Sequence, residues 1–330
     1  MTDVRRQAVV VVGVLISAVA VWFVLGSIDV GEAIAVLGRA NPLPLLAILG
    51  VVSVQIALRS WRWSILIPIR PDGTRVSAIR LVPPLLVGYL GNAVLPARLG
   101  EPMRAVIASR RERVGTTEAL GSVLVERVID VATLAPVAFV AAVLVGAAGW
   151  TTQILAVAAG LGIAGIVILT TIGVHPLLRI ADRLGLRRRP RARSVAVRLA
   201  DTVGGRSRRR ALLAAAAISV AAWLLDAASF WLAAQSVGVQ LPYTGAMVIA
   251  GVTVLGTAIP SAPGYVGTFE LAAAGMAGAL GVPGAPALAM ALVTHFMTLV
   301  PVALAGAASL VGMGARLGEV AQAAENQRGA

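Results

Sequence analysis

The stretch Gly88-Tyr-Leu-Gly-Asn-Ala-Val-Leu-Pro-Ala-Arg-Leu-Gly-Glu-Pro-Met-Arg104 decides the fold. Apolar, helix-like sequence leads up to it from Leu81, and the stretch then gathers glycines, prolines, an asparagine and three charged residues. In a soluble protein this composition would indicate a loop. Here the chain on both sides is hydrophobic enough for lipid, and irregular backbone at membrane depth is tolerated only where protein or a watery cavity covers it. The stretch therefore predicts a break, in or near a membrane, that marks a pathway or a binding site.

The composition indicates a polytopic membrane protein. The chain has 330 residues, of which 58% are hydrophobic and 13% are charged, with a mean hydropathy of +0.89. Soluble domains carry about 25% charged residues. The absence of cysteine excludes disulfides and thiolate metal sites. Two histidines are too few for a histidine-rich zinc site, so no metal and no other cofactor is expected.

The net charge of +13 indicates orientation in the membrane rather than a nucleic-acid partner. The basic residues gather in loops, and segment 175–210 alone holds twelve arginines and two aspartates. The positive-inside rule makes this segment cytoplasmic and close to anionic headgroups. Arg5 and Arg6 place the N-terminus inside as well. The apolar run at 8–25 is long for a signal peptide, so we expect it to be retained as a transmembrane helix.

Apolar runs give the number of membrane spans. Uninterrupted runs cover 8–25, 43–67, 119–148, 154–174, 211–237 and 285–313. Two further runs, 81–108 and 244–280, are interrupted by proline and glycine. Arginines flank the first interrupted run on both sides, which predicts a re-entrant hairpin entered from the cytoplasm. The second has uncharged flanks, which predicts a hairpin entered from outside. An eight-helix bundle with kinked helices is the alternative.

The predicted fold is an all-α polytopic integral membrane protein. It has six full transmembrane helices plus two oppositely oriented re-entrant hairpins in an inverted repeat, the plan of secondary transporters. We expect it in the cell membrane with both termini cytoplasmic. The predicted divisions are a first repeat at 1–150 with its hairpin at about 81–108, the first helix of the second repeat at 151–174, an Arg-rich cytoplasmic loop at 175–210, the rest of the second repeat at 211–313 with its hairpin at about 244–280, and a cytoplasmic tail at 314–330.

A second broken stretch, Ile259-Pro-Ser-Ala-Pro-Gly-Tyr-Val-Gly-Thr-Phe-Glu270, has the character of the first. Glu270 follows this break much as Glu101 follows the first one, so we expect the two carboxylates to be the ends of one functional unit. Glu270 has no basic neighbour in sequence, which makes Arg98 or Arg127 the natural partner. The residues expected to form the breaks are Gly88, Pro96, Gly100, Pro260, Pro263, Gly264 and Gly267.

Charged residues beside the first break are candidates for binding an anionic headgroup. Arg98, Glu101 and Arg104 are three apart and would share one face of a helix. The planar fork of arginine suits phosphate, and Glu101 would hold the arginines in place. A structural ion network that caps the hairpin is the alternative.

Further charged residues lie within the apolar runs. Arg127 and Asp130 are spaced for an internal ion pair, which leaves Glu126 as a candidate protonatable group. Asp226 lies mid-span and requires a partner or water. His295 is either a hydrogen-bonded packing residue or a titrating group among buried carboxylates. Arg59, Trp61, Arg62 and Trp63 end the run at 43–67 as an interfacial belt would, with both tryptophans as anchors.

Taken together, these motifs resemble the flippase-like family related to the transmembrane domain of lysylphosphatidylglycerol synthase. The resemblance runs from about Arg59 to Gly306. The pattern Gly-x-x-x-Asn…Leu-Pro-x-Arg-x-Gly-Glu-x-x-Arg is met by Gly88, Asn92, Leu95, Pro96, Arg98, Gly100, Glu101 and Arg104. The pattern Glu-Arg-x-x-Asp is met by Glu126, Arg127 and Asp130. The pattern Pro-x-x-Pro-Gly-x-x-Gly-x-x-Glu is met by Pro260, Pro263, Gly264, Gly267 and Glu270. His295 stands where such proteins often carry arginine.

The resemblance implies a lipid translocator that passes a phospholipid or polyprenyl-phosphate-linked headgroup through a polar cavity between the repeats. Without a synthase domain in this sequence, the chain is not expected to make lysyl-lipid and is read as a transporter rather than an enzyme. The expected substrate-binding residues are Asn92, Arg98, Arg104 and Arg127. The expected charge-balance or proton-coupling residues are Glu101, Glu126, Asp130, Asp226, Glu270 and His295.

Two other function classes remain open. One is an intramembrane glycosyl- or aminoacyl-transferase acting on a lipid-linked substrate, although the sequence shows no nucleotide motif or metal cluster. The other is a non-transporting scaffold for enzymes of envelope biosynthesis. Membrane lipids are the expected partners under every reading.

Overall fold

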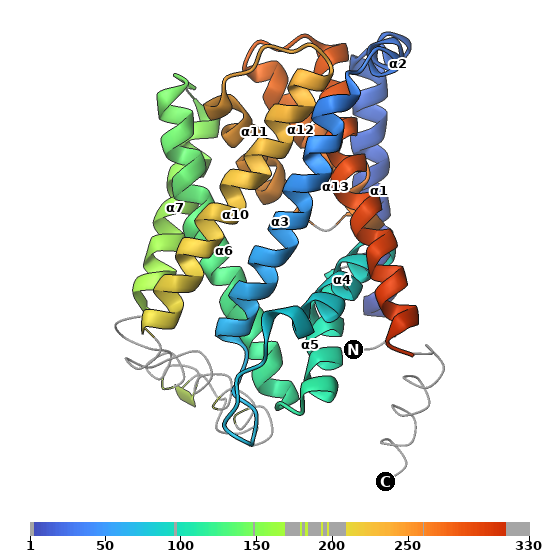
Figure 1. Ribbon diagram of the computed structural model, residues 1–330. Coiled ribbons are helices and arrows are strands. Elements are labelled where there is room, and N and C mark those ends of the chain that lie inside the picture. The colour runs from blue at the N-terminus through green and yellow to red at the C-terminus, as the bar shows by residue number, and fades with distance from the viewer. Residues whose placement is uncertain are drawn as a thin grey trace.

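The computed structural model describes residues 3–95, 98–147, 149–168, 209–259 and 261–314, together with positions 179, 182, 183, 193 and 197. All regular structure within these ranges is helical. The longer helices are α1 (Asp3–Ser27), α3 (Pro42–Leu66), α6 (Thr116–Leu144), α7 (Trp150–Val167), α10 (Arg209–Ser236) and α13 (Gly284–Gly312). The shorter ones are α2 (Val30–Gly38), α4 (Ala78–Val94), α5 (Gly100–Glu112), α11 (Tyr243–Gly256), the 3₁₀ turn η5 (Pro263–Tyr265) and α12 (Thr268–Ala279), as Figure 1 shows.

Five helices, α3, α6, α7, α10 and α13, are long and apolar enough to cross a membrane. A sixth span is reached if Val14–Ser27 of α1 and the whole of α2, which meet at 84°, count as one broken span. The expectation of an all-α membrane protein is therefore confirmed. The expected six full spans correspond to five, or up to six, helices of sufficient length.

Local sequence explains where these helices begin and end. The side chain of Asn41 caps α3 by accepting a hydrogen bond of 3.0 Å from Leu43 N, and Pro42 at the first position has its φ already set for a helix. The helix ends just before Pro68, because the residue before a proline is pushed out of the helical region.

The first broken stretch forms two short helices that pack closely at glycine. A Cβ on Gly100 would lie 1.9 Å from the carbonyl oxygen of Gly88, so α4 and α5 approach as only glycine permits. The amide oxygen of Asn92 accepts a hydrogen bond of 3.0 Å from Gly100 N. The second broken stretch likewise separates α11 from α12, with Gly264 and Gly267 at φ values of +68° and +85°. Pro96 and Pro260 lie outside the described residues.

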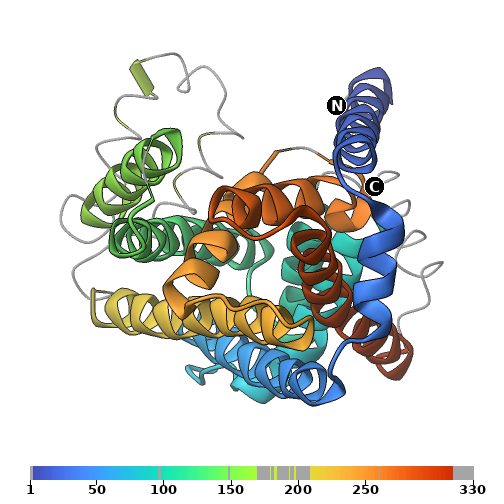
Figure 2. The ribbon, with the colours of Figure 1, turned by 90° about the horizontal axis from the view of Figure 1, so that it is seen from above.

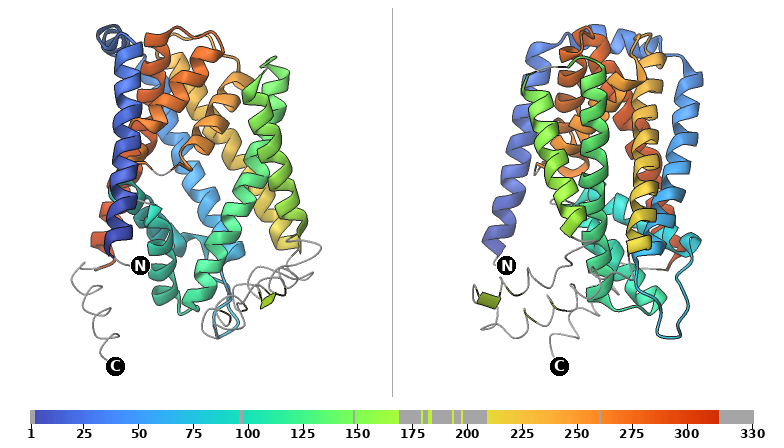
Figure 3. Two further views of the ribbon diagram at one scale, coloured as in Figure 1. Left: turned by 180° about the vertical axis from the view of Figure 1, so that it is seen from behind. Right: turned by 90° about the vertical axis from the view of Figure 1, so that its left-hand side faces the viewer.

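The two short pairs occupy opposite halves of the molecule. Helices α4 and α5 lie in the lower half and α11 and α12 in the upper half (Figures 1 and 3). Seen along the long axis, α10 and α3 run side by side, α6 and α7 form a neighbouring pair, and α1 stands at the edge beside α12 (Figure 2). The tight α6–α7 contact uses small residues, since a Cβ on Gly162 would lie 2.6 Å from Ala132 Cα.

The start of α1, the end of α13, the 67–77 loop and the end of α5 share one end of the molecule (Figure 1). Glu112 is 1% exposed there and forms ion pairs with Arg70 and Arg80, the latter at 2.9 Å. Burial alone would raise the pKa of the Glu112 carboxyl, but the hydrogen bonds from Arg70 and Arg80 outweigh it and hold the pKa below its usual value. The Arg70 pair fastens the 67–77 loop to α5, and the Arg80 pair joins α4 to α5. Residues 315–330 of the predicted tail and most of the loop at 175–210 lie outside the described residues.

Candidate functional site

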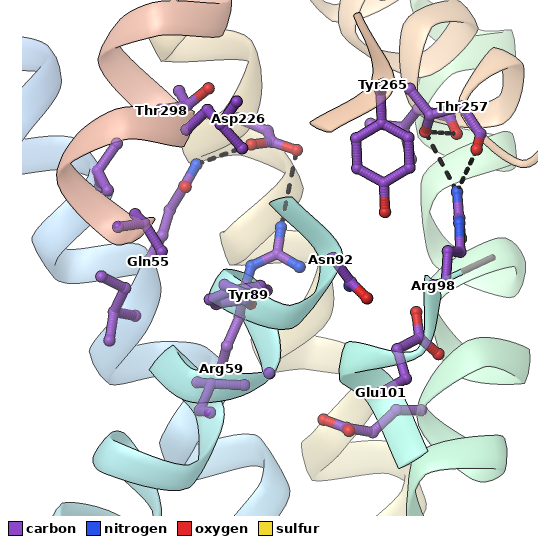
Figure 4. A pocket seen from close by; sticks show the side chains of 18 of the residues that line it. Gln55, Arg59, Tyr89, Asn92, Arg98, Glu101, Asp226, Thr257, Tyr265 and Thr298 are labelled. Carbon is purple, nitrogen blue, oxygen red and sulfur yellow. Dashed lines mark hydrogen bonds and ion pairs between the residues drawn. The ribbon is translucent and has the colours of Figure 1, made fainter. Parts of the chain in front are cut away.

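A cavity of about 270 Å³ lies between the two broken stretches. Helices α3, α4, α5, α6, α10, α11, α12 and α13 all contribute lining residues (Figure 4). Its charged lining consists of Arg59, Arg62, Arg98, Arg104, Arg127, Glu101, Glu126 and Asp226. So many charges between apolar helices are costly unless they are paired. The arrangement of these pairs therefore defines the chemistry of the site.

Arg62 is the centre of the buried ion network. Its Nη2 lies 3.1 Å from Glu126 Oε1, its Nη1 donates to Ser219 Oγ at 2.6 Å, and a further ion pair joins it to Asp130. Arg62 is only 2% exposed, and Glu126 only 1%. The network joins α3, α6 and α10 in a single contact. The assignment of Arg62 to an interfacial belt is therefore wrong.

Arg104 extends this network into α5. Its Nη2 lies 2.5 Å from Glu126 Oε2, and its guanidinium stacks 4.5 Å from the ring centroid of Trp63. Its Nη1 is buried and has no hydrogen-bond partner within the described chain. Glu126 is thus shared by two arginines. The expectation that it would be left without an ion-pair partner is wrong. Trp63 is fully buried and donates to Ser122 Oγ at 3.0 Å, so it is not an interfacial anchor, whereas Trp61 is exposed.

Arg127 connects the network to the first break. One nitrogen, Nη2, lies 3.0 Å from Asp130 Oδ2, and the other, Nη1, lies 3.4 Å from Glu101 Oε1. The side chains of Arg127 and Glu101 are 38% and 19% exposed, so this outer pair is open to exchange with water or a ligand. Glu101 was predicted to hold Arg98 and Arg104 in place. Its carboxylate instead pairs with Arg127.

Arg98 stands apart from this network. It has a left-handed backbone with φ of 53° and precedes α5, so it does not share a helical face with Glu101 and Arg104 as expected. Its Nη2 donates to the carbonyl oxygen of Thr257 at 2.6 Å, and its guanidinium lies 5.4 Å from the ring centroid of Tyr265 (Figure 4). Arg98 consequently bridges the first broken stretch to the second.

Asp226 forms a separate polar group on the opposite wall (Figure 4). Gln55 Nε2 donates to its Oδ1 at 3.1 Å, and Arg59 Nη2 lies 3.7 Å from its Oδ2. Arg59 also stacks 4.9 Å from the ring centroid of Trp223. Arg59 and Arg62 line the cavity although neither was predicted as a site residue. The spacing of Gln55, Arg59 and Arg62, by four and then three, places all three on one helical face and was the available signal.

Glu270 is bound within its own half of the molecule. Its Oε1 lies 2.5 Å from His295 Nδ1, and its Oε2 accepts from Gly267 N at 2.7 Å. This second bond is the glutamate half of a capping box at the start of α12, because glycine has no side chain to supply the other half. The ring of Phe269 stacks on His295 with centroids 4.2 Å apart. The prediction that Glu270 pairs with Arg98 or Arg127 is therefore wrong, because its partner is His295. Nε2 of His295 is buried and has no partner within the described part of the chain.

The remaining candidates fall into two kinds. Asn92 lines the cavity, but its amide oxygen is already engaged with Gly100 N. Gly88 and Gly100 allow the close approach of α4 and α5, and Pro263, Gly264 and Gly267 shape the second break.

Among the described residues, no group of three or more His, Cys, Asp or Glu side chains is placed to hold a metal ion.

Comparison with known proteins identifies the family. The family described as the lysylphosphatidylglycerol synthase TM region matches residues 10–306. The chain belongs to this family. It is also similar to the glycosyltransferase AglD of Haloferax volcanii, at 26% identity over 357 aligned positions. That alignment covers 95% of this chain but 56% of the relative, so the chain spans just over half the length of that protein.

Proposed function

We propose that the protein is a lipid translocase that moves a phospholipid or polyprenyl-phosphate-linked headgroup across the bilayer. The headgroup would occupy the central cavity while the acyl or prenyl chains stay in lipid. The observation that carries the proposal is five arginines around one cavity among membrane-spanning helices. A space of about 270 Å³ is enough for a phosphorylated headgroup but not for the lipid chains.

Arg98, Arg104 and Arg127 are the proposed phosphate contacts. Arg98 is held by a carbonyl oxygen, Arg104 has a buried nitrogen without a partner, and Arg127 belongs to a partly exposed pair. Each retains donors for phosphate oxygens, which arginine binds in a bidentate manner. Glu101, Glu126 and Asp130 balance the charge of Arg104 and Arg127 when the cavity holds no lipid.

Proteoliposomes test this proposal directly. Purified protein should accelerate the inward or outward passage of a fluorescent short-chain anionic phospholipid, measured as the fraction accessible to an external quencher over time. Exchange no faster than in protein-free vesicles would contradict the proposal. The Arg110→Gln variant, which alters an exposed arginine at the end of α5, should behave as the native chain does.

We also propose that the two short helix pairs are re-entrant hairpins of an inverted repeat, with both termini in the cytoplasm of a cell-membrane protein. The location of α4–α5 and α11–α12 in opposite halves supports this arrangement. Because the chain has no cysteine, single cysteines can be introduced cleanly. Cysteines near positions 75 and 111 should both react with a membrane-impermeant reagent from the cytoplasm, and cysteines near positions 238 and 282 from outside. Opposite accessibility of 75 and 111 would contradict the first hairpin.

A second candidate function is transfer of a sugar to a lipid phosphate, because the similar protein AglD of Haloferax volcanii is a glycosyltransferase. An assay for glycosylated lipid, using purified protein, a polyprenyl phosphate and sugar donors, separates the two functions. Product formation by the purified chain would favour the transferase, whereas lipid passage without product would favour the translocase.

A further inference from the structure

The ion pairing around the cavity also indicates which headgroups it accepts. We propose that the site selects headgroups of net negative charge, in which a phosphate is joined to an uncharged substituent such as a polyol, and disfavours headgroups that carry an added cationic aminoacyl group. Arg98 is the residue that determines this preference. The inference rests on the proposed function only in taking a lipid headgroup as the ligand.

The carboxylates that line the cavity are already paired with arginines. Glu126 meets Arg62 at 3.1 Å and Arg104 at 2.5 Å. Glu101 meets Arg127 at 3.4 Å, and Asp226 meets Arg59 at 3.7 Å. No carboxylate that lines the cavity is therefore left without an arginine among the residues the structure describes.

A cationic headgroup would consequently find no free partner. To reach a carboxylate, its ammonium group would have to displace an arginine, and it would then lie beside the arginines that remain. Like charges held close in a medium of low dielectric repel strongly, and the displaced arginine would itself become an unpaired buried charge. The carboxylates of the cavity thus serve the arginines and are not available to a cationic ligand.

Arg98, by contrast, is not paired with a carboxylate of the described residues. It is the one lining arginine that has no carboxylate within 4.0 Å in the described ranges. Only its Nη2 has a hydrogen-bond acceptor there, the backbone and side-chain oxygens of Thr257. A guanidinium carries five N–H donors, so Nη1 and Nε remain free for an incoming acceptor.

Arg98 is also held in position before any ligand binds. The carbonyl of Thr257 and the ring of Tyr265 fix the guanidinium on the cavity wall (Figure 4). Its left-handed backbone, unusual for a residue other than glycine, is a local strain of the kind that persists at functional sites. A fixed, uncompensated cation is suited to an anion, because little conformational freedom is lost when the anion binds.

Equilibrium binding of soluble lipid analogues tests the inference. Purified full-length protein in neutral detergent would be titrated calorimetrically with dihexanoyl phosphatidylglycerol and with its lysyl ester. We expect the anionic lipid to bind at least tenfold more tightly. Raising the salt concentration should weaken binding of the anionic lipid. Equal or tighter binding of the lysyl ester by the native chain would overturn the inference, and this comparison requires no variant.

Variants then test the role of Arg98. Arg98→Gln should weaken binding of the anionic lipid about tenfold or more and reduce the preference over the lysyl ester, because a hydrogen-bonded charge is removed. Arg98→Lys keeps the positive charge but lacks the planar guanidinium, so it should lose less affinity for the anionic lipid than Arg98→Gln does. Arg110→Gln is the matched control, with the same change in net charge on an exposed residue of α5, and should bind as the native chain does. Native affinity in a folded Arg98→Gln protein would refute the assignment.

The outcome also separates this inference from the proposed function. Selective binding of the anionic lipid without any passage in proteoliposomes would contradict the translocase and leave the selectivity intact. Equal passage of both lipids in proteoliposomes would contradict the selectivity and leave the translocase intact.

Discussion

The two broken stretches use the same backbone device with opposite electrostatic consequences. Each has a Pro/Gly break followed by a short helix with glutamate in its first turn. Glu101 forms one pair at 3.4 Å with a side chain that is 38% exposed, whereas Glu270 is fixed by two contacts of 2.5 and 2.7 Å. The partly exposed charges at the first break can therefore exchange partners. At the second break, the carboxylate of Glu270 is held by the helix N-terminus and by His295. Similar sequence motifs do not imply the same role.

Substitutions in the two regions should therefore lower the stability of the protein by different amounts. The charge network of Arg62, Arg104, Glu126 and Asp130 lies beside the first break. The second break contains one carboxylate, Glu270, which pairs with His295 of α13. We therefore expect the largest effects on stability from the network at the first break.

Arg62→Met should be the most damaging of these changes. It takes one of two arginine partners from each of the buried carboxylates Glu126 and Asp130, and removing one partner of a buried pair costs about 3–5 kcal/mol. The melting temperature of the purified protein in detergent measures the loss. Arg62→Met combined with Asp130→Asn should recover part of it, because Glu126 keeps Arg104 and Arg127 keeps Glu101. An unchanged melting temperature in the single variant would show that the network contributes nothing to stability.

Gly100→Ala compared with Gly256→Ala contrasts the packing of the two short helix pairs. The added Cβ on Gly100 would lie 1.9 Å from a backbone carbonyl, whereas on Gly256 it would lie 3.2 Å from the Cβ of Ala272. We expect a loss of about 1–3 kcal/mol at Gly100 and a smaller one at Gly256. Gly275→Ala, with nothing within 4 Å of the new Cβ, is the control. Equal losses at Gly100 and Gly256 would mean that the first pair is not the tighter one.

Glu270→Gln should destabilise the protein by about 1 kcal/mol. Glutamine can still accept from Gly267 N, but the charged partner of His295 is lost, and a hydrogen bond to a charged group is stronger than a neutral one. Glu32→Gln makes the same change in the first turn of α2, where the side chain is exposed, and should leave the melting temperature unchanged. If the two variants behave alike, the contact with His295 has no role in stability.

The sequence predicted the helical class, the family, both breaks and the carboxylates Glu101, Glu126, Asp130, Asp226 and Glu270. It did not predict the partners of those carboxylates. Arg59 and Arg62 were missed because arginine and tryptophan near the end of an apolar run are typical of a membrane interface as well as of a cavity. The partner of Glu270 could not be read locally, because His295 lies 25 positions away on another helix. Arg98 was misplaced because a left-handed residue outside the helix does not follow helical spacing.

Glu101→Gln should have the smallest effect on stability and a large effect on function. Its pair with Arg127 is partly exposed, and such pairs contribute about 0–1 kcal/mol, so the melting temperature should change little. The loss of this carboxylate leaves Arg127 with Asp130 alone and makes the cavity more positive, which should strengthen the hold on an anionic headgroup and slow its release. We therefore expect slower lipid passage in proteoliposomes together with tighter equilibrium binding of dihexanoyl phosphatidylglycerol. Glu118→Gln, an acidic residue in the first turn of α6 away from the cavity, is the control. If Glu101→Gln lowers the melting temperature as much as Glu270→Gln and leaves lipid passage unchanged, the contrast between an exchangeable and a sealed carboxylate is wrong.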